Sequence, residues 1–236
     1  MALKLCALFS RTERSCEEKS QNSVSSSRIS RDEEYDFEDA TSKLTPLSVV
    51  ADAFEELSAV VKANGFDYDL DLKTFCDACS LVSDLFGCLG KAFIFAELDY
   101  RSKVSDLAEA SESYGTLNNI LDFDVQNDTV RIRGSLSRYL RRVRQGLDLL
   151  RVLFQNFVSS DLNSLCKKCA PYQTWAVRTA VSAGMYALPT REQLLSKLNE
   201  TDESAQREMI RYIEASLPII QYIDKLYTSR NISLDW

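Results

Sequence analysis

The spacing of apolar residues limits this chain to helical structure. After residue 45, apolar side chains recur at intervals of three and four residues almost without a break, which is the period of an amphipathic helix. The 236 residues include only 7 glycines and 4 prolines, so few positions suit hairpin turns or phosphate-binding glycine loops. The sequence therefore predicts an all-α protein, and its apolar content of 45% is sufficient for a sizeable core.

A change of composition near residue 44 divides the chain into two parts. Residues 1–43 are rich in Ser, Arg and Glu and lack sustained apolar periodicity, which is typical of a disordered leader. Pro46 then suits a first helical position, and Gly65 can end the helix that it begins. We expect one helical domain over residues 44–236, with eight helices near 46–63, 70–86, 90–113, 116–125, 128–158, 168–187, 190–198 and 203–228.

The residue inventory excludes several kinds of chemistry. The chain contains no histidine, so histidine-based triads, general bases and metal sites are impossible. No nucleotide-binding glycine motif is present, and we predict a protein that is not an enzyme and has no cofactor. Two Cys-x-x-Cys pairs, Cys76 with Cys79 and Cys166 with Cys169, leave a four-thiolate zinc site as an alternative. Because the first pair lies inside a helical pattern, we predict ordinary packing and no metal.

Charge and hydropathy indicate the compartment. The formal net charge of -7 argues against nucleic-acid binding, which needs a broad basic face. No stretch approaches the roughly 18 to 20 apolar residues of a membrane span, and Lys4 interrupts the apolar opening of the chain. Seven cysteines without a secretory signal indicate reduced thiols. We expect a cytoplasmic monomer, and acylation of Cys6 or Cys16 stays open.

One helix concentrates positive charge. The stretch "SRYLRRVRQGLDLL", residues 137–150, places four arginines within seven positions. At 100° per residue, Arg138 and Arg142 lie nearly opposite the apolar stripe, with Leu149 and Leu153 further along their own side. Arg141 and Arg144 are expected to be solvated. The stripe itself is the predicted core face and consists of Leu136, Leu140, Val143, Leu147, Leu150 and Phe154.

A second helix carries a complementary order of residues. Asp99 and Lys103 share a face, and Phe95 and Ala96 precede them on it. If the two helices pack antiparallel, the four charged residues meet at one end, with Phe95, Ala96, Leu149 and Leu153 below, which suits an amphiphile with an anionic head. From spacing alone, two alternatives stay open. Asp99 and Lys103 also fit an ordinary surface pair, and the arginines could contact an acidic partner helix or RNA.

Four stretches of the sequence together resemble a known family. They are "AELDYRSKV", "SRYLRRVRQGLDLLRVLF", "APYQTWAVRTAVSAGMYALPTR" and "NISLDW", and they are similar to the glycolipid transfer protein superfamily, in particular its plant accelerated-cell-death branch. The resemblance covers roughly residues 45–236. It implies an all-α, two-layer sandwich of about eight helices that encloses lipid chains between its layers.

The resemblance also implies a head-group site. The branch that carries ceramide-1-phosphate has Asp, Lys, Arg and Arg at the positions of Asp99, Lys103, Arg138 and Arg142, whereas glycolipid-binding members have Asn and Trp at the second and fourth. Asp99 would accept a hydrogen bond from the lipid amide N–H. A family His-Gly-Trp motif reads Gln173-Thr174-Trp175 here, so Gln173 would replace the histidine that donates to the lipid carbonyl. Trp175 would order the site by packing.

These observations predict a sphingolipid transfer protein that shuttles ceramide-1-phosphate passively between membranes and contacts the membrane surface only transiently. The alternative is a lipid-sensing or scaffold protein of programmed cell death or defence signalling that has lost efficient transfer. A glycolipid-specific carrier is less favoured, because Lys103 and Arg142 suit a phosphate better than a sugar. Protein partners stay open.

Overall fold

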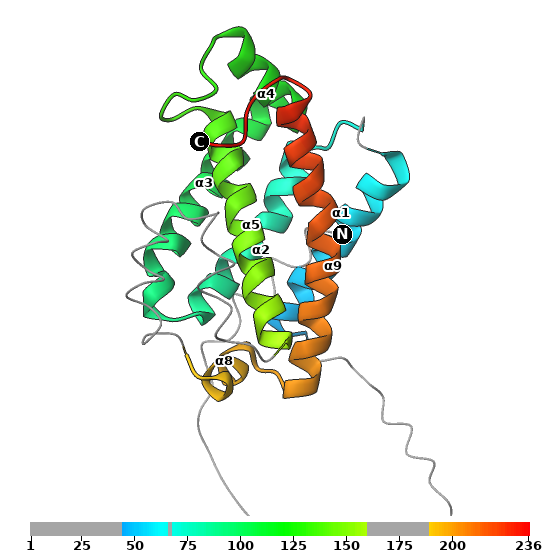
Figure 1. Cartoon of the computed structure of the whole chain (residues 1–236), viewed down its shortest axis with the longest axis vertical. Helices are drawn as coiled ribbons and strands as arrows, with labels where there is room; N and C mark the ends of the chain where they lie inside the picture. Colours follow the sequence, from blue (N-terminus) through cyan, green and yellow to red (C-terminus); the bar gives the residue numbers. More distant parts are fainter. Residues whose placement is uncertain (1–43, 66–67, 160–188) are drawn as a thin grey trace, which may run out of the picture. The chain divides into compact units, whose positions relative to one another are not determined.

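The computed structural model describes residues 44–65, 68–159 and 189–236. Within them, the regular structure is helical, and the only extended pairing is an isolated bridge between Asp71 and Thr116. The predicted helix over residues 168–187 and the predicted leader over residues 1–43 lie outside the described residues. The elements in chain order are α1 (Pro46–Asn64), α2 (Leu72–Cys88), the 3-10 turn η3 (Lys91–Phe93), α3 (Ile94–Tyr114), α4 (Leu117–Gln126), α5 (Leu136–Val158), α8 (Arg191–Leu198) and α9 (Asp202–Thr228) (Figure 1).

Helix α1 begins and ends where the sequence predicts. The Thr45 hydroxyl accepts a hydrogen bond from the backbone N–H of Ser48, and the Ser48 hydroxyl accepts one from the backbone N–H of Thr45. This reciprocal cap satisfies two of the N–H groups that a helix start leaves free. Pro46 occupies the first turn, and Gly65 ends the helix with a φ of 76°, a conformation that glycine adopts without steric cost.

The start of α5 differs from the prediction. We expected this helix from about residue 128, but it begins at Leu136. Gly134 adopts a φ of 101°, which interrupts any helix that precedes it. The Ser135 hydroxyl then caps the helix by accepting from the backbone N–H of Arg138, and the buried Asp124 carboxylate accepts from the backbone N–H of Ser137 at 2.7 Å. Local caps therefore fix the start of α5 eight residues later than the apolar pattern suggested.

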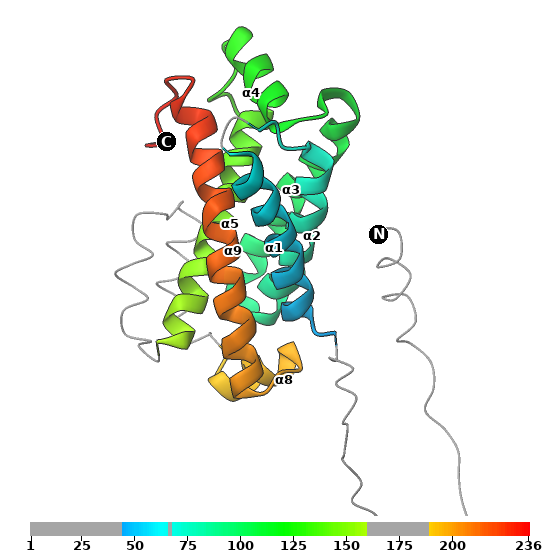
Figure 2. The same cartoon turned by 90° about the vertical axis from the view of Figure 1, so that its right-hand side faces the viewer.

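The described helices pack in two layers. Helix α2 lies against α3, and α5 lies against α9 (Figures 1 and 2). The first pair meets the second through α3 and α5, and α1 packs against both α2 and α9. None of the described helices is both long and apolar enough to cross a membrane.

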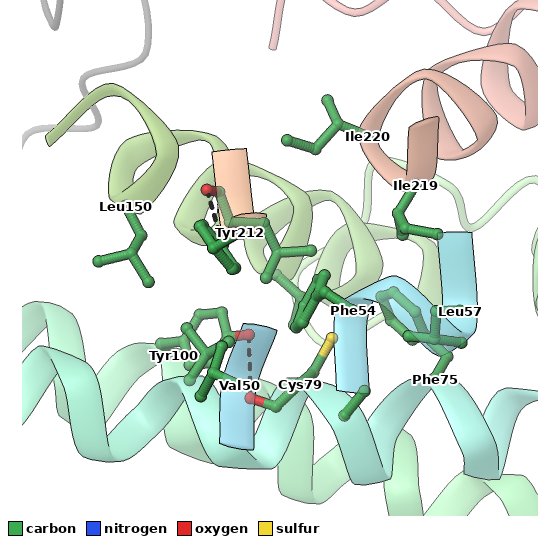
Figure 3. Close-up of a cluster of buried hydrophobic side chains, with 14 of the residues drawn as sticks. Val50, Phe54, Leu57, Phe75, Cys79, Tyr100, Leu150, Tyr212, Ile219 and Ile220 are labelled. Carbon is green, nitrogen blue, oxygen red and sulfur yellow. Dashed lines mark hydrogen bonds between the residues drawn. The ribbon is translucent and has the colours of Figure 1, made fainter. Parts of the chain in front are cut away.

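Aromatic rings fill the centre of the core. The Tyr212 ring of α9 packs edge-on against Phe54 of α1 and Phe154 of α5, with ring centroids 5.2 and 5.6 Å apart. Its hydroxyl donates to the carbonyl of Leu147 at 3.2 Å, and the Tyr100 hydroxyl donates to the carbonyl of Cys79 at 3.1 Å (Figure 3). These bonds satisfy the only polar atom of each side chain, so both rings can be buried at little cost.

The first cysteine pair packs as predicted. Cys76 and Cys79 are buried among apolar side chains of the core, where small apolar residues are expected. Burial is the main reason that the pKa of the Cys76 thiol is raised to about 12, so this thiol stays protonated at neutral pH. The second pair, Cys166 and Cys169, lies outside the described residues.

Candidate functional site

The site lies where α3 and α5 come close together. A Cβ atom at Gly146 of α5 would lie 2.4 Å from a ring carbon of Tyr100 on α3, so only glycine allows this approach. Further along, the Lys103 ammonium lies 4.8 Å from the centre of the Tyr139 ring. Tyr100 thus lies against Gly146, and Lys103, further along α3, lies against Tyr139, which comes earlier in α5. The two helices are therefore antiparallel. This arrangement confirms the packing predicted from their charge order.

Antiparallel packing brings the four predicted charged residues to the same stretch of the helix pair: Tyr139, next to Arg138, lies under Lys103, and Arg142 is near Asp99. The Lys103 Nζ atom lies 3.8 Å from the Asp99 Oδ1 atom on the same helix. On α5, burial lowers the pKa of the partly buried Arg142 guanidinium. The negative charge of Asp99, across the interface, raises this pKa, and the positive charge of Arg138 lowers it further. Arg142 remains charged at physiological pH, because the ordinary arginine pKa lies far above it. The surface pair predicted as one alternative is present, but it belongs to this larger cationic group.

Two of the three cations have only neutral partners. The Arg138 guanidinium donates to the backbone carbonyl of Arg131 at 3.0 Å, and the Arg142 guanidinium lies 3.5 Å from the side-chain oxygen of Gln145. Within residues 44–65, 68–159 and 189–236, neither of them forms an ion pair with a carboxylate. Their charges are therefore available to an anion. Guanidinium groups bind phosphate through forked, charge-assisted hydrogen bonds.

The prediction that Arg141 and Arg144 are solvated is wrong. Arg141 is only 8% exposed, and its guanidinium donates to the carbonyl of Leu234 near the end of the sequence. Arg144 forms ion pairs with Asp148 of its own helix at 2.9 Å and with Asp224 of α9 at 2.6 Å. Both arginines are held by residues distant in the sequence, which periodicity within one helix cannot reveal.

The predicted apolar residues divide into two groups. Leu149 is buried, and Leu153 is partly buried against the core. On α3, Ala96 is partly buried against the core, but Phe95 is 74% exposed. The described residues therefore do not enclose Phe95 with the other three. Gln173 and Trp175 lie outside the described residues.

Two aromatic residues at the site were not among the predicted site residues. Tyr139 lies beneath the Lys103 ammonium. Trp236 lies with its ring centre 5.9 Å from the Arg138 guanidinium. The sequence did carry a signal for Trp236, because apolar and polar residues alternate in the closing "NISLDW", which is the pattern of an extended segment with one packed face.

The fold of the described residues and the site together define a class: a two-layer helical protein with a cationic site on a closely packed helix pair. Residues 70–200 match the family described as Glycolipid transfer protein (GLTP). An Arabidopsis thaliana relative described as "ACD11 homolog protein" is 55% identical over 225 residues, which cover 88% of this chain and 98% of that protein. The chain therefore belongs to the glycolipid transfer protein family.

Solved structures agree with this assignment. A crystal structure of a mutant of Arabidopsis ACD11 (accelerated-cell-death 11) complexed with C12 ceramide-1-phosphate matches with a TM-score of 0.76 and 42% identity, covering 82% of this chain and 99% of that chain. Human ceramide-1-phosphate transfer protein in complex with 12:0 ceramide-1-phosphate matches with a TM-score of 0.65 and 21% identity, covering 79% and 97%. The second likeness shows the fold alone. The predicted fold class is confirmed.

Proposed function

We propose that this protein binds ceramide-1-phosphate and carries it between membranes. Lys103, Arg138 and Arg142 would bind the phosphate, and Asp99 would accept a hydrogen bond from the lipid amide N–H. The observation that carries the proposal is that, among the described residues, Arg138 and Arg142 donate only to neutral oxygens. A relative that is 42% identical was crystallised with ceramide-1-phosphate, which supports this choice of ligand.

The chemistry of the site favours a phosphate over a sugar. A phosphomonoester offers several anionic oxygens, and each hydrogen bond that a charged donor makes to them is worth about 1.5–3 kcal/mol. A neutral sugar is better matched by a flat aromatic ring and amide groups. Three cations around one carboxylate would leave an excess of positive charge that only an anionic head group offsets.

The transfer step would need no covalent chemistry. Burying an acyl chain is worth about 0.8 kcal/mol per CH2 relative to water, but a bilayer offers the same environment. Moving the tails from membrane to protein is therefore nearly neutral, and selectivity resides in the head group. We infer a passive, non-enzymatic carrier that acts as a cytoplasmic monomer and contacts membranes transiently.

The direct test is transfer of labelled ceramide-1-phosphate between vesicles by the full chain. Arg142→Ala should lower the transfer rate at least tenfold, because the phosphate loses a charged donor. Arg101→Ala is the matched control, since Arg101 lies on α3 but is exposed and paired with Glu97 at 3.1 Å; it should stay near the wild-type rate. Undiminished transfer by Arg142→Ala would contradict the proposed site. Equal transfer of galactosylceramide by the wild-type chain would contradict phosphate selection.

Substitutions of Gln173 distinguish a lipid carrier from the alternative, a lipid sensor or scaffold. In the carrier, a glutamine amide can donate to the lipid carbonyl without titrating, so Gln173→His should change neutral-pH affinity by no more than about 1 kcal/mol and add a pH dependence near pH 6–7. Gln173→Leu should cost more, because the carbonyl then loses its partner. If the wild-type chain is nearly inactive in transfer and Gln173→His restores strong transfer, the result would favour a lipid sensor or scaffold over a carrier.

The leader and Trp175 complete the proposal. We infer that residues 1–43 are a separate leader and residues 44–236 the lipid-binding domain, so deleting residues 1–43 should leave vesicle transfer intact. A large loss would mean that the leader is part of the site or of the membrane contact. Trp175 would order the apolar part of the site together with Ala96, Leu149 and Leu153, whereas Phe95 is exposed.

A further inference from the structure

The final residues of the sequence return to the cationic end of α5. Helix α9 ends at Thr228, and the Arg230 guanidinium then donates to Asp122 at 2.6 Å and to Asn118 at 2.7 Å, both on α4. Asn231 adopts a left-handed φ of 56°, which turns the chain. These contacts fix the start of the segment formed by residues 230–236.

The same segment is held along its length. Ile232, Leu234 and Trp236 are partly buried against the core, while the residues between them are exposed, as expected for an extended strand of chain with one packed face. The Leu234 carbonyl accepts from the buried Arg141. The Trp236 indole N–H donates to the carbonyl of Ser233 at 2.6 Å, so packing and this bond together orient the ring.

Three guanidinium groups surround that ring. Its centre lies 5.8 Å from Arg131, 5.9 Å from Arg138 and 5.8 Å from Arg141. These distances are within the range of about 6 Å over which an aromatic face attracts a cation. Like charges gathered this closely repel one another, and among the described residues the cluster has one carboxylate, Asp235, whose Oδ1 lies 3.7 Å from Arg131.

We propose that Trp236 is a positioning residue that holds Arg138 in place for the phosphate without neutralising its charge. This inference rests on the proposed function, because it assigns Trp236 a role at the same head-group site. A carboxylate in the place of the ring would also restrain Arg138, but it would pair with the guanidinium and compete with the incoming anion. The ring attracts the cation through its quadrupole and carries no net charge. A side chain that is already ordered loses less entropy when the ligand binds.

Substitutions at Trp236 test whether the side chain restrains Arg138 without neutralising its charge. The full chain is tested for uptake of labelled ceramide-1-phosphate from phosphatidylcholine vesicles, with the melting temperature recorded for each variant. Trp236→Phe, which keeps a ring, should stay within about twofold of the wild-type affinity, and Trp236→Leu should lose about three- to tenfold. Trp236→Glu should bind more weakly than Trp236→Leu, although it can form an ion pair. Wild-type affinity in Trp236→Leu or in Trp236→Glu would overturn the inference.

A double-mutant cycle tests whether Trp236 acts through Arg138. In an Arg138→Ala background, Trp236→Leu should cause no further loss, because the group that it positions is gone. Fully additive losses would overturn the inference. Ile232→Ala is the matched control within the segment, since it weakens the packing and keeps the ring; it should retain ceramide-1-phosphate affinity at a temperature where the protein is folded. A loss equal to that of Trp236→Leu would assign the effect to the segment and not to the ring.

The outcomes also distinguish this inference from the proposed function. If the wild-type chain takes up no ceramide-1-phosphate, both fall. If it takes up the lipid, loses it on Arg142→Ala, and is indifferent to every Trp236 variant, the head-group site stands and the role of Trp236 is refuted.

Discussion

Helix α5 carries two groups of arginines that have different partners. Arg144 and Arg151 both pair with Asp148, at 2.9 and 2.7 Å, and the side chain of this aspartate is only 2% exposed. Arg138 and Arg142 donate only to neutral oxygens among the described residues. The same residue type on the same helix is thus neutralised in one group and left with a free charge in the other.

The difference shows what separates a structural arginine from a binding one. The two groups face different sides of the helix, since Arg142 and Arg144 are about 200° apart at 100° per residue, but the side alone does not neutralise an arginine. The acidic partners decide it, and one of them, Asp224, comes from α9. Breaking a buried ion pair leaves an uncompensated charge and destabilises the fold, whereas removing an arginine without a carboxylate partner removes only a potential ligand contact. Substitutions that break the ion pairs of Arg144 and Arg151 should therefore lower stability, and substitutions of Arg138 and Arg142 should weaken binding.

The largest effect is expected at Asp148. Asp148→Ala removes the buried carboxylate that Arg144 and Arg151 share, although Arg144 keeps its ion pair with Asp224. This should lower the free energy of unfolding by about 3 kcal/mol. Urea unfolding followed by circular dichroism measures the change. Asp77→Ala is the control, because Asp77 is half exposed and its ion pair among the described residues is with Lys73 at 3.4 Å. It should change stability by less than about 0.5 kcal/mol. Equal stability of the two variants would erase the distinction between the arginine groups.

Gly146 lies on the same helix as both groups, and its substitution should affect both stability and binding. Gly146→Ala places a methyl group 2.4 Å from the Tyr100 ring, so α3 and α5 must move apart. Overpacking of this kind costs about 1–3 kcal/mol. Because the same movement separates Asp99 and Lys103 from Arg142, ceramide-1-phosphate uptake should fall as well. Thermal melting and vesicle uptake would check this, and a loss of stability with unchanged uptake would show that the site does not depend on the close helix contact.

A single substitution can convert a binding arginine into a neutralised one. Gln145 faces Arg142, whose guanidinium lies 3.5 Å from the glutamine oxygen. Gln145→Glu supplies a carboxylate at nearly the same place, which should raise stability by a few tenths of a kcal/mol and weaken ceramide-1-phosphate uptake by about 1 kcal/mol, roughly fivefold. Gln145→Met, similar in size and uncharged, is the control for shape. If the Glu variant binds as well as the Met variant, the free charge on Arg142 is not what the ligand uses.

The sequence predicted the features that depend on the residue pattern within single helices. The apolar period placed the described helices, and the core stripe of α5 is confirmed, since Leu140, Val143, Leu147 and Leu150 are fully buried. The charge order on α3 and α5 predicted that Asp99 and Arg142 would meet, because antiparallel packing leaves few other arrangements. These inferences use only the 3.6-residue period and the direction of the chain.

The rest depends on contacts that periodicity does not contain. Arg141 was expected in solvent, but the final segment covers it, and the sequence offers no spacing rule that brings Leu234 to α5. The late start of α5 depends on the φ of Gly134 and on Asp124 of the preceding helix. Phe95 fits the apolar face of an isolated helix, yet it is largely exposed. For Arg141 and for the start of α5, residues outside the helix determine the outcome.

The smallest effect is expected at a third kind of arginine, one that is neutralised and only partly buried. Arg211 of α9 donates to Glu55 and Asp52 of α1, at 2.9 and 2.5 Å. Its hydrogen bond to Glu55 lowers the pKa of that carboxyl below the ordinary value of 4.5, whereas burial acts in the opposite direction. A lowered folded-state pKa contributes stability that is present above the unfolded-state pKa and is lost as the pH falls through the folded one. Because the Glu55 side chain is 45% exposed, Glu55→Gln should cost only about 0.5 kcal/mol at pH 7, and the difference from the wild type should be smaller at about pH 3. Melting temperatures of both proteins at the two pH values, at low salt, would measure this. A cost at pH 7 as large as that of Asp148→Ala would mean that burial does not set the structural value of these ion pairs.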